Sequence, residues 1–423
     1  MVQQPSAANP VETREAFDRT GILVLTVLCL AMFSGGMNAM GLQPFLVDIG
    51  SSLGSSVPAV GQAMTVTLLM SAVTGLFAGP VADHFGHRRL MVGGAVLLGV
   101  SGLGTALAPN YLVFMGSRLF GGASLALLTG LSLAIAGSYF TGPARRRALS
   151  IAVSAMSGTA ILGVPLLSWV GDAFGWRWAF AAIGLIAATL APLLHRVIPL
   201  TTPATTGFQV GQIISAYKPL LRQRAVVALY AGSFLRAIFW LGILTYYGAF
   251  MIERFDLSLQ QVGLTYMFGG VGFLAGSLLA GGRLGQVDHR VLFAVATLLS
   301  ALFFGLTYSV SPGAISAVLL LTIGGGFGAI GWVILNTMLA NESQAGSGTT
   351  MSLNNSIFNL GSAAGGAVGG VLLAVGDYTT LGLGLPAFAV LASLTVWWSG
   401  RFQVASSPPD QSLSEASHNV QTN

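Results

Sequence analysis

The amino-acid sequence predicts an all-α membrane protein whose 12 transmembrane helices form two halves of six. Composition is the first observation behind this prediction: 54% of the 423 residues are hydrophobic and only 7% are charged, whereas soluble domains carry roughly 25% charged residues. The second is a series of apolar runs, each close to the roughly 20 residues that a helix needs to cross a bilayer. The third is a polar stretch at 196–224, with six runs on either side.

The apolar runs predict the spans in order. We expect them over residues 21–46, 57–81, 90–108, 111–140, 148–170, 178–195, 225–250, 262–282, 291–309, 312–339, 349–375 and 380–399. The first run is too long for the apolar part of a signal peptide, so we expect it to be retained as helix 1. The 57 glycines suit membrane helices, because small residues let two backbones approach closely.

The polar stretches divide the chain into parts. We expect a cytoplasmic N-terminal tail (1–20), a first six-helix half (21–195), a cytoplasmic linker (196–224), a second six-helix half (225–400) and a disordered cytoplasmic C-terminal tail (401–423). The end of the linker, from Phe208 to Arg224, mixes apolar and basic residues. Such a composition is typical of a helix that lies on a membrane surface.

Basic residues predict the orientation of the chain. Of the 18 Lys and Arg residues, only Arg177 and Arg254 fall in loops on the side opposite the termini, and Arg118 and Arg236 fall inside spans. Cytoplasmic segments carry the excess of Lys and Arg in membrane proteins. We therefore expect a multi-pass protein of the cell membrane with both termini in the cytoplasm. The net charge of +5 then needs no nucleic-acid partner.

The short segment from Gly79 to Leu90 concentrates charge between the second and third runs. It holds Asp83, then Gly86, then Arg88 and Arg89. Gly79 and Gly86 permit close backbone approach or unusual dihedral angles, and the arginines favour the cytoplasmic side. The residues alone leave two interpretations open, a basic turn that sets topology and a turn with a functional role.

The pattern Gly-x-x-x-Asp-x-x-Gly-x-Arg-Arg in this segment resembles the signature loop between helices 2 and 3 of the major facilitator superfamily. Arg118 in helix 4 stands in Phe114-x-x-x-Arg118-x-x-Gly-Gly122, which is similar to the helix-4 motif of that superfamily. A weaker echo of the first signature runs from Gly282 to Arg290 in the second half, with Gln286 in the place of the acid.

Other stretches resemble the 12-helix drug/proton antiporter branch of the superfamily. Gly158, Gly163 and Pro165 in helix 5 are similar to its glycine–proline motif, although Val164 separates the last two. Two more stretches share this resemblance: Gly175-Trp176-Arg177-Trp178-Ala179-Phe180 at the start of helix 6, and Asn354, Asn359, Gly361 and Gly365 in helix 11.

The resemblance implies a secondary active transporter that works by alternating access on a small solute. We favour proton-coupled efflux, with protons as the coupling ion and the lipid bilayer as surroundings, by a chain that functions as a monomer. The alternative is an uptake symporter or facilitator for a small polar or anionic solute, sugar-like or an organic acid. A non-transporting membrane receptor is a third hypothesis, because a fold alone does not fix function.

The resemblance also gives gating or coupling roles to the motif residues. Asp83, with Arg88 and Arg89, is the candidate latch to the start of helix 11 at Gly348; the alternative is a static packing role. For Arg118 we prefer a coupling or structural role over a side chain that reaches the outer surface. The full set of candidates is Gly79, Asp83, Gly86, Arg88, Arg89, Arg118, Gly158, Gly163 and Pro165.

Arg236, near the middle of helix 7, is the main candidate for a contact with the solute. A charged residue inside a span is rare and usually faces a cavity or a partner, so backbone and polar groups are the alternative partners. Further candidates are Asn38, Gln43, Gln62, Trp240, Tyr246, Tyr247, Asn336 and Asn355, each of which could equally be an ordinary contact between helices. No carboxylate lies at a span centre, which argues against lipophilic cations and leaves Asp83 and Asp48 to carry protons.

The sequence offers little to an enzyme hypothesis. Gly50-Ser51-Ser52-Leu53-Gly54 matches the nucleophile-elbow pattern by letter but lacks the strand–turn–helix context. A Walker A motif, a His-Glu-x-x-His motif and a cysteine cluster are all missing. We expect no enzyme activity, no cofactor, no metal and no nucleic-acid partner, and the sequence names neither the solute nor the direction of transport.

Overall fold

The computed structural model describes residues 18–200, 210–282, 287–343 and 347–402. These residues contain 12 helices long and apolar enough to cross a membrane, which confirms the predicted all-α fold. The first half contains α1 (Arg19–Met40), η1 (Gln43–Phe45), α2 (Leu46–Leu53), α3 (Val57–Phe85), α4 (His87–Ala106), α5 (Tyr111–Tyr139), α6 (Gly142–Gly158), η2 (Thr159–Gly163), α7 (Val164–Phe174) and α8 (Trp176–Val197). After α9 (Val210–Arg222), the second half contains α10 (Arg224–Phe255), α11 (Leu259–Ala280), α12 (His289–Val310), α13 (Ala314–Glu342), α14 (Ser347–Val375), α15 (Tyr378–Gly384), α16 (Pro386–Ser399) and η4 (Gly400–Phe402).

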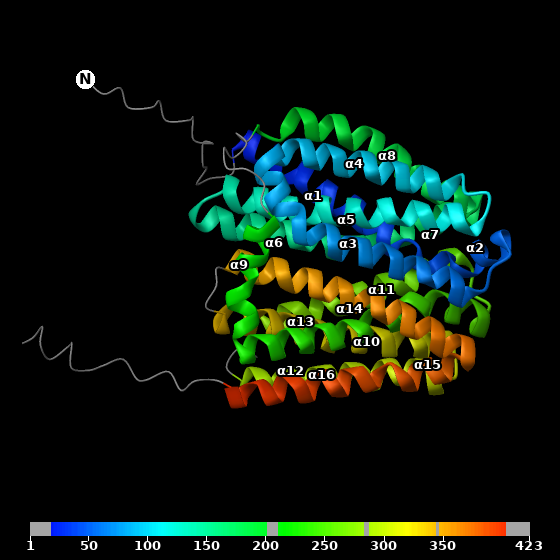
Figure 1. The fold of residues 1–423 in the computed structure, drawn as a ribbon. Helices are drawn as coiled ribbons and strands as arrows, with labels where there is room; N and C mark the ends of the chain where they lie inside the picture. The colour runs from blue at the N-terminus through cyan, green and yellow to red at the C-terminus, as the bar shows by residue number, and fades with distance from the viewer. Residues whose placement is uncertain (1–17, 201–209, 283–286, 344–346, 403–423) are drawn as a thin grey trace, which may run out of the picture.

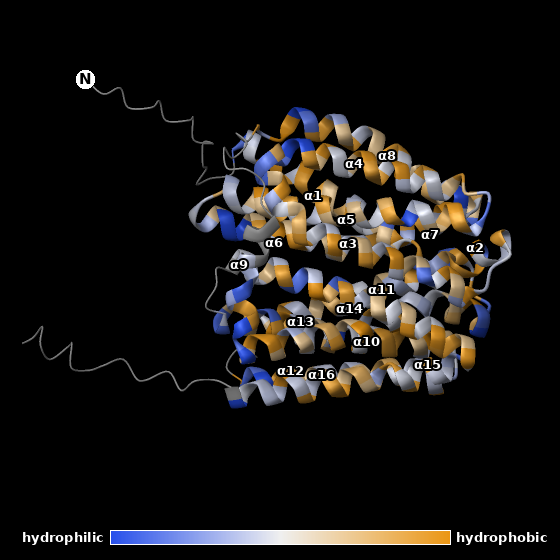
Figure 2. Ribbon diagram, in the orientation of Figure 1, coloured by the Kyte–Doolittle hydropathy of each residue, from blue (hydrophilic) through white to orange (hydrophobic). Residues whose placement is uncertain are grey.

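Two helical bundles lie side by side, one built from α1 to α8 and the other from α10 to α16 (Figure 1). α9 lies at the end of the molecule where α1 begins and α16 ends. We name this the α9 end, and the opposite end, which holds α2 and α15, the α2 end. Figure 2 shows hydrophobic residues along the helices and hydrophilic residues mainly at the two ends, as a bilayer requires.

The turn between α3 and α4 is the single residue Gly86. Its φ of 91° is a conformation that glycine adopts readily and other residues avoid, so the unusual dihedral angle expected here is present. α3 continues through Pro80 to Phe85, so that Asp83 lies on the last turn of a helix and not in a loop. A side chain at Gly79 would meet nothing within 4 Å, so the close backbone approach expected there is not found in this conformation.

Several helices extend beyond the predicted spans, and two of them extend furthest. The first continues past residue 46 through η1 and α2 to Leu53, and α6 begins at Gly142, which places Arg145, Arg146 and Arg147 on a helix. Hydropathy marks where a chain leaves the apolar layer, whereas a helix ends where its backbone hydrogen bonds end. The two limits therefore differ wherever a helix projects beyond the apolar layer.

The two halves meet closely at the α2 end. A side chain at Gly248 of α10 would come within 2.7 Å of the carbonyl oxygen of Gln43 in η1. A side chain at Gly61 of α3 would collide with the ring of Tyr246 in α10. Backbone therefore packs against the other half at this end, and the α2 end is closed.

The halves separate toward the α9 end. α3 and α14 are joined by the 3.3 Å hydrogen bond from Asn359 Nδ2 to Ser71 Oγ, and they remain in contact one turn further on, where a side chain at Gly75 would lie 3.3 Å from Ser356 Oγ. Nearer the α9 end, side chains at Gly79 and at Gly348 would both meet open space, and the Asp83 side chain is 65% exposed. The structure is therefore closed at the α2 end and parted at the α9 end.

The orientation predicted from the basic residues makes the α9 end cytoplasmic. In a Cys29→Ala background, Pro143→Cys, which is exposed at the start of α6, should escape a membrane-impermeant maleimide in intact cells. Ser51→Cys, which is exposed in α2, should be labelled. Permeabilised cells control for reactivity, and the reverse pattern in intact cells would contradict the orientation.

Candidate functional site

Arg118 lies in α5 and is fully buried among helices of the first half. Its Nη1 donates to the carbonyl oxygen of Asn38 at 3.1 Å, and its Nη2 donates to Asn38 Oδ1 at 3.2 Å and to Ser101 Oγ at 2.9 Å. Nη2 also donates to Thr105 Oγ1, and the guanidinium lies 5.3 Å from the ring centroid of Phe180. Arg118 thus contacts α1, α4 and α8 from α5.

The glycine three residues after Arg118 makes room for this network. A side chain at Gly121 would lie 2.7 Å from both Asn38 Nδ2 and Ser101 Oγ. All the acceptors around Arg118 are neutral oxygens, and its complete burial shows that it does not reach the outer surface. This geometry supports the structural role, while the coupling role stays a prediction.

The glycine–proline segment of helix 5 contains a π-helical turn, Thr159–Gly163, between α6 and α7. Pro165 has no backbone N–H, and its ring would clash with the carbonyl four residues earlier, which favours a widened turn. A side chain at Gly163 would lie 2.6 Å from Met37 of α1, and one at Gly263 of α11 would lie 3.1 Å from Pro165 Cα. The segment therefore packs between α1 and the second half.

The candidate latch is open in this structure. Asp83 lies 3.8 Å from His87 Nε2, one turn away, and Arg88 and Arg89 form no ion pair within the described residues. At the start of α14, Tyr230 Oη of α10 donates to the carbonyl oxygen of Thr350 at 3.1 Å. The structure does not bring Asp83 to α14, so the latch stays a prediction for a conformation in which the α9 end closes.

The segment of the second half that resembles the signature, Gly282 to Arg290, takes part in an ion pair that the sequence did not predict. Arg290 Nη2 lies 2.7 Å and 2.9 Å from the two carboxylate oxygens of Glu342, and Arg290 Nε donates to Ser399 Oγ at 3.2 Å. Gln286, in the place of the acid, lies outside the described residues. The acid comes instead from the end of α13, so α12, α13 and α16 are joined at the α9 end.

Arg236 has a different environment from Arg118. Its side chain is only 2% exposed, and it donates one hydrogen bond within the described chain, from Nη2 to the carbonyl oxygen of Gly328 in α13. The guanidinium carbon lies 5.4 Å from the ring centroid of Trp240 and 5.7 Å from that of Trp332. Trp240 was a sequence candidate, whereas Trp332 was not, because an aromatic residue in an apolar run carries no local signal of its role.

The remaining candidates fall into separate groups. Gln43 and Tyr246 belong to the closed α2 end, where Tyr246 Oη donates to Gly366 O at 2.9 Å. Tyr247 is buried beside Tyr266, and the Gln62 side chain lies near Gly370 of α14.

Asn336 and Asn355 lie on α13 and α14. Asn336 Nδ2 donates to Trp332 O at 2.8 Å, close to the Arg236 environment. Asn355 is exposed, and its neighbour Asn354 makes the buried contact, a 3.1 Å hydrogen bond to Asn336 Oδ1. A helix turns by about 100° per residue, so an error of one position in the sequence changes the face.

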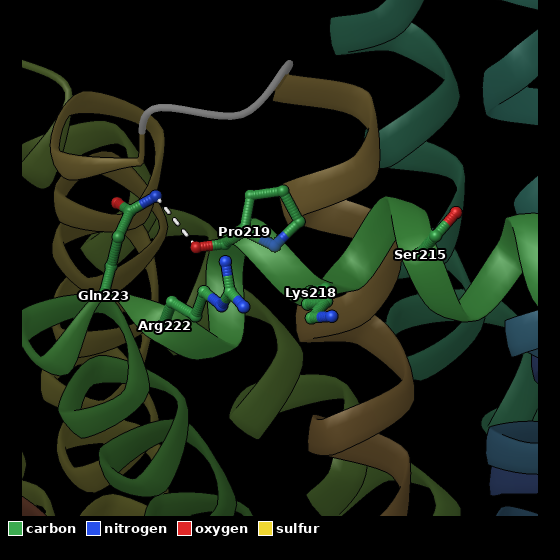
Figure 3. A pocket seen from close by; sticks show the side chains of 5 residues that line it. All are labelled: Ser215, Lys218, Pro219, Arg222 and Gln223. Atoms are coloured by element: carbon green, nitrogen blue, oxygen red, sulfur yellow. Dashed lines mark hydrogen bonds between the residues drawn. The ribbon is translucent and has the colours of Figure 1, made fainter.

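A cavity of about 450 Å³ lies at the junction of α9 and α10. It is lined by Ser215, Lys218, Pro219, Arg222 and Gln223 (Figure 3). Gln223 Nε2 donates to the carbonyl oxygen of Pro219 at 3.2 Å. This cavity lies at the α9 end and outside the spans, so it is separate from Arg118 and Arg236.

Comparison with known proteins gives a consistent family. A family model described as Major Facilitator Superfamily matches residues 28–365. The chain is 24% identical over 353 residues to the Transcription regulatory protein OpdE of Pseudomonas aeruginosa, covering 82% of this chain and 86% of that protein. It is 23% identical over 414 residues to the uncharacterized MFS-type transporter YwfA of Bacillus subtilis, covering 96% and 98%.

Solved structures show the same fold at low identity. A D-xylose-proton symporter matches with a TM-score of 0.71 at 20% identity, covering 89% of this chain and 97% of that one. A bacterial homolog of the human lysosomal transporter Spinster, in an inward-facing and unoccupied conformation, matches with a TM-score of 0.70 at 13% identity, covering 92% and 97%.

The network around Arg118 can be tested through Asn38. Asn38→Leu removes the side-chain acceptor, and because a hydrogen bond to a charged group is worth about 1.5–3 kcal/mol, we expect a lower melting temperature of the purified protein. Asn38→Asp keeps the acceptor and adds a countercharge, so it should melt near the parent. A Leu variant as stable as the parent would show that Asn38 does not stabilise the buried guanidinium.

Proposed function

Because this chain belongs to the Major Facilitator Superfamily and is a secondary transporter, we propose that it exports a small solute in exchange for protons. In this proposal the two halves alternate between a packing closed at the α2 end and one closed at the α9 end. The α9 end faces the cytoplasm, and the chain works as a monomer in the cell membrane.

The observation that carries the proposal is the unequal packing of the two halves. They are in backbone contact at Gly248 and Gln43, and they are apart at Gly79 and Gly348. Alternating access needs two packings that are close in free energy, and this is the geometry of one of them. With the α9 end in the cytoplasm, an exporter would bind its solute in this state.

A coupling role for the helix-5 segment is supported by its position between the two halves. Its π-helical turn and Pro165 lie where the first half contacts α11, so a rearrangement of this turn would alter the contact between the halves. We propose that Asp83 and Asp48 carry the protons. Like every acid in the described chain, they lie in or beside the first or last turn of a helix, so the described chain offers no carboxylate at the centre of a span.

Uptake of a small polar or anionic solute is the second candidate function, and Arg236 favours it. A buried guanidinium with a single protein hydrogen bond suits an anion better than a lipophilic cation. The name of the Pseudomonas relative, a transcription regulatory protein, supports a third candidate function, a receptor that binds a solute without moving it.

Flux measurements separate these functions. The purified protein would be reconstituted in liposomes, and protease protection of the α9 end would report its orientation. A panel of small solutes would then be tested under an imposed pH gradient. We expect solute to move from the cytoplasmic side against a proton flux, and an uncoupler to abolish accumulation. Accumulation in the direction of proton flow would show symport, and binding without flux would show a receptor.

Asp83→Asn tests the latch. The change removes the charge and keeps the shape, and because Arg88 and Arg89 remain, insertion into the membrane should be normal while transport falls by at least about tenfold, the equivalent of about 1.4 kcal/mol. Asp256→Asn is the matched control, since Asp256 is exposed at the α2 end with a φ of 54°, which Asn tolerates. A flux in Asp83→Asn equal to that of the parent would show that Asp83 has only a static packing role.

A further inference from the structure

Arg236 carries a positive charge into the middle of the molecule. It lies 12 residues after Arg224, so about 18 Å along α10 at a rise of about 1.5 Å per residue. All the acidic residues of the described chain lie at helix ends, and the described residues include no carboxylate paired with Arg236. A guanidinium remains charged at any physiological pH, so this site has a charge that the described protein does not neutralise.

The hydrogen bonds of Arg236 are also incomplete. A guanidinium has five N–H donors, and the structure gives Arg236 a single bond within the described chain, to the carbonyl oxygen of Gly328. Arg118, at a similar degree of burial, donates to Asn38, Ser101 and Thr105. The chain is therefore able to surround an arginine with acceptors, and it has not done so at Arg236.

A second unsatisfied group lies beside Arg236. Thr297 of α12 is 1% exposed, and its hydroxyl has no hydrogen-bond partner within the described chain. Gly331 of α13 lies between the two: a side chain there would be 3.0 Å from Thr297 Oγ1 and 3.6 Å from Arg236 Nε. Two donors thus face the same side of a residue that has no side chain.

Aromatic rings border this site. Trp240 and Trp332 both lie within 6 Å of the guanidinium carbon, measured to their ring centroids. Phe293 lies 4.0 Å from the position that a side chain at Gly331 would take. A ligand bound here would meet positive charge and a hydroxyl at one point and flat apolar surface around it.

We propose that Arg236 and Thr297, which both lie against Gly331, bind the carboxylate of an organic anion whose apolar part lies against Trp240 and Trp332. This inference rests on the proposed transport function and adds the class of the solute, an aryl or similarly apolar carboxylate. The planar guanidinium donates to one or both carboxylate oxygens, which suits arginine better than lysine. The Thr297 hydroxyl donates to the same group.

Binding to the purified full chain in nanodiscs tests the proposal without requiring flux. The probes are benzoate, its neutral amide benzamide, the cation benzyltrimethylammonium, and inorganic phosphate as an anion without an apolar part. Quenching of tryptophan fluorescence should saturate with benzoate and occur much more weakly with the other three. Equal binding of the cation or the amide, or no binding of benzoate, would overturn the proposal, and tighter binding of phosphate would overturn the apolar-carboxylate class.

Three variants locate the site. Thr297→Val should weaken benzoate binding about tenfold, the effect of one lost hydrogen bond to a charged group, and leave the melting temperature unchanged or higher, because the hydroxyl has no protein partner. Gly331→Ala should weaken binding because its methyl group would crowd Thr297 Oγ1 and Arg236 Nε, while every charge is kept. Arg236→Lys should weaken binding more than Thr297→Val.

Ser124→Ala is the matched control, since Ser124 of the first half is also a buried hydroxyl without a partner in the described chain. Its benzoate affinity should equal that of the parent. If Thr297→Val and Gly331→Ala both bound benzoate with the affinity of the parent, the proposed site would be wrong. A chain that binds benzoate here and transports no solute would contradict the proposed function and leave this inference standing, so the two failures are distinct.

Discussion

The most demanding groups in this chain are the two guanidiniums inside the bilayer. On insertion scales an arginine at the centre of a span costs about 2.5–3.5 kcal/mol, and few waters are present to reduce that cost. At Arg118 the protein itself lowers this free-energy cost. Oxygens of α1 and α4 accept hydrogen bonds from the guanidinium, and the absence of a side chain at Gly121 leaves room for them. Arg236 receives a single carbonyl oxygen and two indole rings. Of the guanidinium nitrogens of Arg118, only Nε is a buried donor without a partner within the described chain, whereas in our proposal Arg236 is completed by its ligand.

Close backbone contact between helices governs how the halves meet. Glycines at positions such as Gly61 and Gly248 let α3 and α10 reach the opposite half, where any side chain would overlap a ring or a carbonyl. Dispersion contacts of this kind fall off steeply with distance, so the closed end is held by fit and not by charge. Within the part of the chain that the structure describes, this contact contains no ion pair, so opening it does not require two charges to be separated.

The sequence was sufficient for the fold, because the number of spans follows from run length and composition. It also drew attention to Arg118 and Gly86, because a charge in an apolar run and a glycine at a turn can be recognised from the sequence, while their gating or coupling roles stay predictions. It could not identify Glu342 as the partner of Arg290, or Thr297 and Gly331 as neighbours of Arg236. Those contacts depend on which helix faces converge, and nothing local distinguishes one threonine of an apolar run from another. Asp83 shows a further limit, because its surroundings differ between conformations and a sequence pattern does not specify which conformation is occupied.

The ion pair of Arg290 with Glu342, extended by the hydrogen bond to Ser399, has a mechanical consequence. It joins the ends of three helices at the α9 end, with both charged side chains about 15% exposed or less, so water screens it only in part. In the first half the corresponding Arg88 and Arg89 form no such pair within the described chain, and Asp83 is exposed. We therefore expect the second half to be stiffer at this end than the first. When the cytoplasmic ends approach each other, the second half would move as a rigid body, and the bending would occur in the first.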